Sequence, residues 1–199
     1  MLLLNRPQIT IMKLNGRFIL FTVFLVLIAT ACKYYFGPDL DMSGFSPVIA
    51  IALFSGMIIK QRGASFLLPL LALFISDALI EVFYQQGLFP YGGFYSGQWK
   101  NYALLLLSTL IGWGLKGNTY TSLLVGAIAA PTAYFLVSNF MVWTGGHVTY
   151  SRDFNGLMTC YAAGLPFYKN ALIGMFVFLP VILFTYNYLV VQRKQLVLS

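Results

Sequence analysis

Long apolar runs separated by short polar stretches dominate the pattern of this chain. The runs are continuously apolar, whereas a strand of a membrane barrel alternates between apolar and polar positions. A helix satisfies its own backbone hydrogen bonds in lipid, so continuous runs predict helices. The pattern predicts an all-α, polytopic membrane bundle with six transmembrane helices, at residues 18–36, 48–59, 64–83, 101–115, 120–143 and 166–191.

Two stretches do not have the length of a simple span. Residues 48–59 are only 12 residues long, whereas a bilayer core needs about 20 helical residues. They are expected either as a short, broken helix or as one that extends into the preceding loop. The apolar stretch 154–164 is also short, which is typical of a re-entrant or interfacial piece. Pro166 is expected to open the last helix, because proline suits a first helical turn.

Composition identifies the solvent of these segments. The chain has 199 residues, of which 59% are hydrophobic and 9% charged, and its mean hydropathy is +0.80. A soluble domain carries about 25% charged residues, so the lipid bilayer is the expected partner of most of this surface. The net charge is +7, but the basic residues stand singly or in pairs between apolar runs. That spacing is typical of topology signals and not of nucleic-acid binding.

The distribution of Lys and Arg predicts an orientation, because cytoplasmic segments carry an excess of them. With the N-terminus inside, eight fall on the inner side: Arg6, Lys13, Arg17, Lys60, Arg62, Lys116, Arg193 and Lys194. Four fall on the outer side: Lys33, Lys100, Arg152 and Lys169. We therefore expect a cytoplasmic segment 1–17, a transmembrane domain 18–192 and a cytoplasmic tail 193–199, as a multi-pass protein of the bacterial inner (cytoplasmic) membrane.

The first apolar run has two interpretations. Basic residues followed by an apolar stretch that ends at Cys32 are typical of a signal peptide. Tyr34, Tyr35 and Phe36 continue the run, however, as the aromatic belt of a membrane span does. A retained first helix is therefore favoured.

Asp77 is the first candidate for function, because it lies inside a predicted span and shares a helix face with Glu81. Ionisable residues in a membrane are costly and usually have a defined task. One hypothesis is that Asp77 binds a cation or a basic group of a ligand. The alternative is that it caps or pairs with a neighbouring helix, or with Lys100 or Lys169.

Asn139 is the second candidate, in a stretch of 35 residues without a formal charge. It lies about one helical turn below Trp143, near the outer boundary. Lipid offers no partner to its amide, so the side chain must face protein, water or a ligand. The two hypotheses are a hydrogen bond between helices and a ligand contact in a pocket that opens outward.

The residues of common enzyme motifs are missing. The sequence contains no H-E-x-x-H, no G-x-S-x-G and no glycine-rich phosphate loop with lysine. An enzyme would need His147, Asp153 and Cys160 as a cluster within about 6 Å. We therefore expect neither an enzyme nor a cofactor or metal site, and the cysteines Cys32 and Cys160 are expected as buried thiols.

Four stretches resemble an uncharacterised bacterial family of six-span membrane proteins. They are "GFSPVIAIALFSG" (44–56), "LLPLLALFISD" (67–77), "SNFMVW" (138–143) and "GLMTCYAAGLPFYKNALIG" (156–174). The resemblance covers roughly residues 18–190. That family is distantly similar to the substrate-binding S components of energy-coupling-factor vitamin transporters. The S components meet a membrane partner through small residues spaced by three on their first helix, a pattern that "FILFTVFLVLIATAC" lacks.

The resemblance implies a compact helical bundle with a pocket near its outer face, closed by loops. The residues that fall in matching motifs are Phe45, Ser46, Asp77, Asn139, Trp143, Cys160 and Tyr161. The expected function is that of a vitamin-like substrate-binding or uptake component. Asn139, Trp143, Asp77 and Tyr161 would shape the site, with Phe45 and Ser46 above it and the aromatic loop 84–99 as a lid. The alternative is a structural subunit of a larger membrane complex, with partner subunits and a packed interior.

Overall fold

The computed structural model describes residues 16–59, 61–115, 119–145 and 150–191. Every regular element in these ranges is helical. Most of the expected N-terminal segment, the expected tail 193–199 and His147 lie outside the described residues.

The helices coincide with the predicted segments to within a few residues, except in the last third of the chain. They are α1 (Gly16–Phe36), α2 (Val48–Ile58), α3 (Arg62–Gln85), α4 (Trp99–Leu115), α5 (Tyr120–Thr144) and α6 (Phe154–Tyr186). A 3-10 turn, Leu40–Met42, precedes α2, and a π-helical turn, Asn187–Val191, extends α6. Within the described ranges, four helices are long and apolar enough to cross a membrane, namely α1, α3, α5 and α6 with its π turn. The shorter α2 is also apolar.

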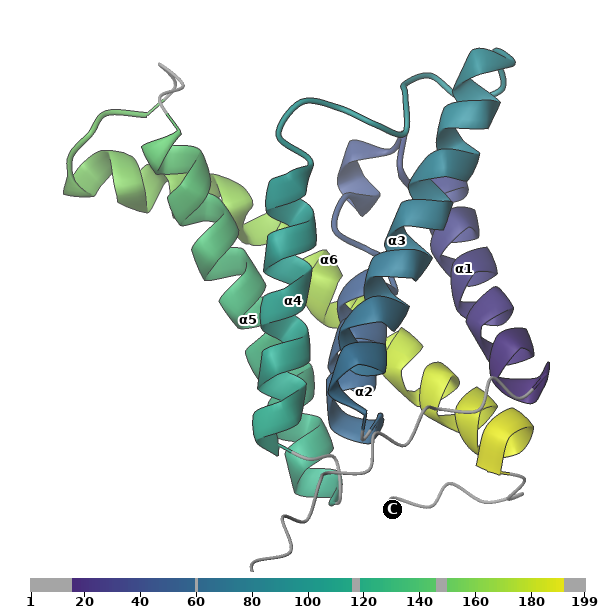
Figure 1. The fold of residues 1–199 in the computed structure, drawn as a ribbon. Helices are drawn as coiled ribbons and strands as arrows, with labels where there is room; N and C mark the ends of the chain where they lie inside the picture. Colours follow the sequence, from purple (N-terminus) through teal and green to yellow (C-terminus); the bar gives the residue numbers. More distant parts are fainter. Residues whose placement is uncertain (1–15, 60, 116–118, 146–149, 192–199) are drawn as a thin grey trace, which may run out of the picture.

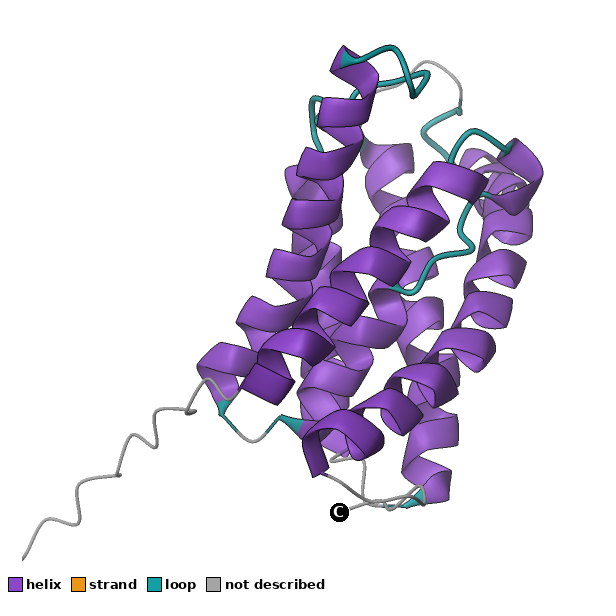
Figure 2. Cartoon of the chain, turned by 90° about the vertical axis from the view of Figure 1, so that its right-hand side faces the viewer, coloured by secondary structure: helices purple, strands orange, loops and turns teal. Residues whose placement is uncertain are grey.

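The helices lie side by side, and most loops gather at two opposite ends of the bundle (Figure 2). The described start of α1 and the described end of the chain lie at the same, lower end in Figure 1. The long connection between α3 and α4, residues 86–98, lies at the upper end. These positions agree with helices that alternate in direction along the chain: in Figure 1, α1, α3 and α5 run upward and α2, α4 and α6 run downward.

Helix α2 forms the centre of the bundle, where it contacts α3, α4, α5 and α6. Its residues 50–57 are all buried. A helix that is apolar on all sides is stable only when other elements cover it. This explains why α2 can be so short: its 11 residues would span only about 17 Å, and it is packed by protein. It is thus the short helix that its length predicted.

Contact between α2 and α4 is close because glycines lie on both sides of it. A Cβ atom on Gly112 would fall 2.9 Å from the Met57 backbone nitrogen, and one on Gly56 would fall 2.9 Å from the Thr109 carbonyl carbon. Real Cβ atoms almost never come closer than 3.0 Å to another atom. Small residues let helix backbones approach in this way inside a membrane.

The prediction that Pro166 opens the last helix is wrong. One continuous helix, α6, begins at Phe154 and includes Pro166 and Pro180. It begins there because Asp153 is its N-cap: the carboxylate accepts the Gly156 N–H at 2.7 Å. Proline inside a helix removes one backbone hydrogen bond and bends the helix without necessarily ending it. The green first part of α6 accordingly runs across the upper end of the bundle, and the remainder descends (Figure 1). The stretch 154–164 is therefore the first part of this helix.

Candidate functional site

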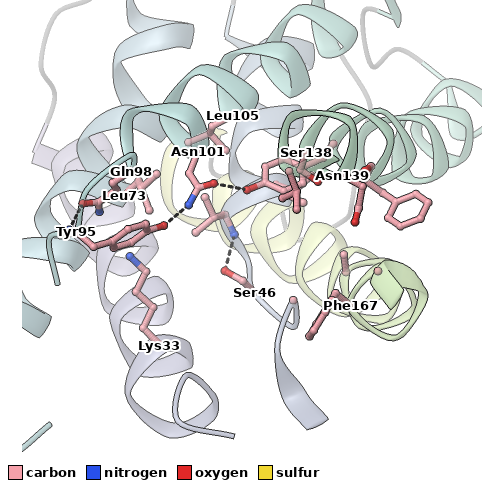
Figure 3. Close-up of a pocket in the computed structure, with 18 of the residues that line it drawn as sticks. Lys33, Ser46, Leu73, Tyr95, Gln98, Asn101, Leu105, Ser138, Asn139 and Phe167 are labelled. Atoms are coloured by element: carbon pink, nitrogen blue, oxygen red, sulfur yellow. Dashed lines mark hydrogen bonds between the residues drawn. The ribbon is translucent and has the colours of Figure 1, made fainter. Parts of the chain in front are cut away.

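A cavity of about 610 Å³ lies between the helices, toward the upper end of the bundle. All six α-helices and the loop 86–98 contribute to its walls. Figure 3 shows Lys33, Tyr95 and Gln98 on one side and Asn139 and Phe167 on the other. Cavities of this size, with mostly apolar walls and a few polar groups, are typical of small-molecule sites.

Asp77 of α3 is the centre of the polar side of this cavity. Its side chain is only 3% exposed and forms an ion pair with Lys33 of α1. Its other carboxylate oxygen accepts hydrogen bonds from Gln98 Nε2 and Tyr102 Oη, both at 2.6 Å. Three donors thus compensate for the burial of this charge.

Asp77 pairs with a neighbouring helix, as one alternative predicted, but the two lysines named as its partners were wrong. The hypothesis of a structural ion pair named Lys100 or Lys169, whereas the structure pairs Asp77 with Lys33. The reason is the packing of α1 directly against α3. Lys33 lies in the last turn of α1, at the level where α3 carries Asp77.

Glu81 has a different task from Asp77, although both lie on one face of α3. Its Oε2 accepts the backbone N–H groups of Gly93 at 2.9 Å and of Phe94 at 3.4 Å. Gln98 Nε2 also donates to the Gly93 carbonyl at 3.1 Å. The two acids therefore hold the loop 86–98 against α3, where Gly93, Tyr95 and Gln98 line the cavity. The loop 86–98 is therefore part of the cavity wall.

Gly93 is the point at which the loop is closest to α3. A Cβ atom there would fall 2.7 Å from the Glu81 backbone nitrogen and 2.9 Å from the Asp77 carbonyl carbon. Backbone atoms of a helix cannot move aside as the end of a flexible side chain can. Only glycine fits this contact without displacing the loop.

We predict that Gly93→Ala loosens the loop 86–98. Overpacking of this kind costs about 1–3 kcal/mol, so hydrogen exchange of the loop amides should accelerate about tenfold or more. Ser96→Ala is the matched control, because Ser96 lies in the same loop and is exposed. Exchange in Gly93→Ala that equals exchange in Ser96→Ala would contradict the close contact.

Asn139 and Ser46 also line the cavity, as Asp77 does. The Asn139 amide donates to the Phe135 carbonyl of its own helix at 2.9 Å and lies against Gly164 of α6. The Cys160 thiol of α6 lies 3.4 Å from the Asn139 carbonyl oxygen, to which it donates. Asn139 therefore lies where α5 meets α6, with its side chain at the cavity wall.

The structure places the other three candidate residues outside the described cavity lining. The Phe45 ring packs against Phe36 and Phe178, with centroid distances of 5.2 and 5.1 Å. Trp143 Nε1 donates to the Ser151 carbonyl at 2.9 Å, and Tyr161 Oη donates to the Leu136 carbonyl at 2.9 Å. Their chain neighbours Gly44, Val142 and Cys160 do line the cavity. The motifs thus lie at the site, while these three side chains are not among the residues that line it.

Sequence reasoning missed a chain of polar groups across the cavity. Tyr134 Oη donates to Asn101 Oδ1 at 3.3 Å, and Asn101 Nδ2 donates to Tyr95 Oη. In the sequence, Asn101 is only the first residue of the predicted span 101–115, and Tyr95 is only one member of the aromatic loop 84–99. An amide at the start of a predicted span was the one available signal.

The Tyr95 phenol is a hydrogen-bond donor at neutral pH. Burial raises the pKa of Tyr95, and the hydrogen bond from Asn101 acts in the opposite direction with a smaller effect. The raised pKa keeps the phenol protonated well above pH 7, since a free tyrosine titrates only near about pH 10.

The fold and the site together define a class: a helical membrane protein with a mostly apolar cavity between its helices, in which a few polar groups line the wall. The chain belongs to the family of unknown function DUF6580, which it matches over residues 12–197. An uncharacterised family is what the sequence motifs predicted. Neither a curated protein nor a solved structure matches the chain.

Proposed function

We propose that the protein binds a small, vitamin-like molecule from the outer side of the bacterial inner membrane, as a substrate-binding or uptake component. The observation that carries this proposal is the cavity with Asp77 and Asn139 in its wall. A structural subunit would be expected to have a packed interior. The similarity to the S components of energy-coupling-factor transporters belongs to the same proposal, as does a membrane partner subunit.

The proposed topology has six spans and both termini in the cytoplasm. Helices α2 and α4 would complete the count beside the four long helices. Arg17 lies in the first turn of α1 and Arg62 begins α3, and both helices begin at the lower end of the bundle in Figure 1. This end would face the cytoplasm, and the cavity with its loop 86–98 would face outward.

Two adjacent alanines of α6 give a matched test of binding. Ala163 lines the cavity and Ala162 is exposed elsewhere on the helix. We expect native mass spectrometry of the protein purified from membranes to show a bound small molecule. Ala163→Phe should reduce its occupancy about tenfold or more, because the new ring takes part of the space in which a ligand must fit. Ala162→Phe should retain it.

Two results would contradict the proposal. One is a wild-type protein that carries no small molecule and binds none from a metabolite extract. The other is equal occupancy in Ala162→Phe and Ala163→Phe. Circular dichroism of both variants establishes that the helices are intact, so that a loss can be assigned to the cavity.

A further inference from the structure

The two charges of the cavity wall cancel each other. Lys33 and Asp77 are the charged residues among the described residues that line it, and they form an ion pair. An additional charge brought into this low-dielectric space by a ligand would have no opposite charge left to compensate it. Burial of an uncompensated ion costs several kcal/mol even after relaxation.

The two partners of the pair are not equally exposed to the cavity. Asp77 is 3% exposed, whereas the Lys33 side chain is 27% exposed. Gln98 and Tyr102 supply Asp77 with two further donors, so this carboxylate already has the partners it needs. Lys33 has three N–H donors and, among the described residues, one acceptor. Figure 3 shows its ammonium group pointing toward Tyr95 at the cavity.

Two other polar groups of the wall, Tyr95 and Ser46, also carry hydrogen-bond donors for which no described residue supplies an acceptor. Tyr95 Oη accepts from Asn101, and no described acceptor takes its own hydrogen. Ser46 Oγ accepts the Val48 N–H at 3.3 Å. No described acceptor takes the Ser46 hydroxyl hydrogen either. Together with Lys33, these groups favour a ligand that carries hydrogen-bond acceptors such as carbonyl oxygens or ring nitrogens.

The opposite side of the cavity is aromatic. Phe135 and Tyr168 are stacked, with ring centroids 4.8 Å apart and an interplanar angle of 24°, and both line the cavity together with Phe167. Aromatic walls favour flat, ring-bearing ligands, because rings stack or meet edge to face.

From these contacts we infer that the cavity selects ligands with no net charge, which bear a flat ring and a carbonyl-type acceptor directed at Lys33. The Lys33–Asp77 pair sets this selectivity, because it leaves no net charge in the wall. This inference rests on the proposed function and specifies the chemical class of its ligand.

Three probes of nearly equal shape test the charge selectivity: benzamide, benzoate and benzylammonium. Binding to the purified protein in detergent is measured by saturation-transfer NMR, and Ala163→Phe defines the signal that comes from the cavity. In the wild type, benzamide should bind about tenfold or more tightly than either ion, as the cost of an uncompensated charge requires.

Variants of the ion pair should change which of the three probes binds most tightly, in opposite directions for the two partners. Asp77→Asn leaves the Lys33 charge uncompensated, so benzoate should become the preferred probe. Lys33→Gln leaves the Asp77 charge uncompensated, so benzylammonium should become preferred. The double variant has no charge at either position and should again prefer benzamide. The double variant also keeps the test valid where one single variant is too unstable to purify.

Three results would overturn the inference: a charged probe preferred by the wild type, a ranking that the charge variants leave unchanged, or no cavity-dependent signal from any probe. A natural ligand that carries a net charge and depends on Ala163 would also overturn it. That last result would leave the proposed function standing, whereas a protein that holds no small molecule at all would refute both.

Discussion

Replacement of Asp77 by alanine is expected to lower the free energy of unfolding by about 3–5 kcal/mol. The variant leaves Lys33 without its counter-charge and removes the acceptor of Gln98 and Tyr102. The value should lie toward the lower limit, because Lys33 is 27% exposed and can recover some solvation in the cavity. Equilibrium unfolding of the protein in mixed detergent micelles measures the change.

A double-mutant cycle separates the ion pair from the other contacts of Asp77. Lys33→Met should also destabilise the protein, because it leaves the buried carboxylate with two neutral donors. The combination of Lys33→Met and Asp77→Ala should cost less than the sum of the two single changes by about 1 kcal/mol or more. Strict additivity would show that the two side chains are not coupled and would contradict the ion pair.

The second large effect is expected at the contact between α2 and α4. Gly56→Leu should lower the free energy of unfolding by about 3 kcal/mol, at the upper end of what overpacking costs. Its Cβ alone would fall 2.9 Å from the Thr109 carbonyl carbon, and the remaining atoms have no space because residues 50–57 are buried. The two helices would have to separate. The same unfolding experiment measures the loss.

Gly114→Leu is the matched control for this substitution. Gly114 also lies in α4, but apart from its chain neighbours and its own helix backbone no described residue has an atom within 4 Å of the position of its Cβ. A side chain there replaces a flexible glycine in a helix, which by itself is favourable by about 0.5–1 kcal/mol. If Gly56→Leu and Gly114→Leu had similar stabilities, the close approach of α2 and α4 would be refuted.

Much of the fold could be predicted from the pattern of the chain. A helix depends on contacts between residues three and four apart and on the medium around it, and both are properties of a local stretch. The segments 18–36 and 120–143 therefore matched α1 and α5 closely. Pro166 was the exception, because its effect depends on whether the packing around it tolerates a bend.

The candidate site could be predicted only in part. Asp77, Ser46 and Asn139 are polar residues in or beside apolar runs, and they do line the cavity. Trp143 and Tyr161 were named because they fall in the motifs of the family resemblance, whereas their side chains donate to the backbone carbonyls of Ser151 and Leu136. Which side of a helix faces a cavity depends on its neighbours, and a short motif does not contain that information.

The sequence by itself determined the helical architecture, the lipid surroundings and the need of Asp77 and Asn139 for partners. Those properties follow from the free-energy cost of placing a polar side chain or an unpaired backbone group in hydrocarbon. That cost applies to each segment separately, so it can be read from the local sequence. Only the tertiary structure decided that the partner of Asp77 is Lys33, 44 residues away. Only the tertiary structure showed that the loop 86–98 contacts the backbone of α3 at Gly93. Contacts of that kind depend on how separate helices pack, because ion pairs and close approaches form between surfaces that no single stretch of the chain contains.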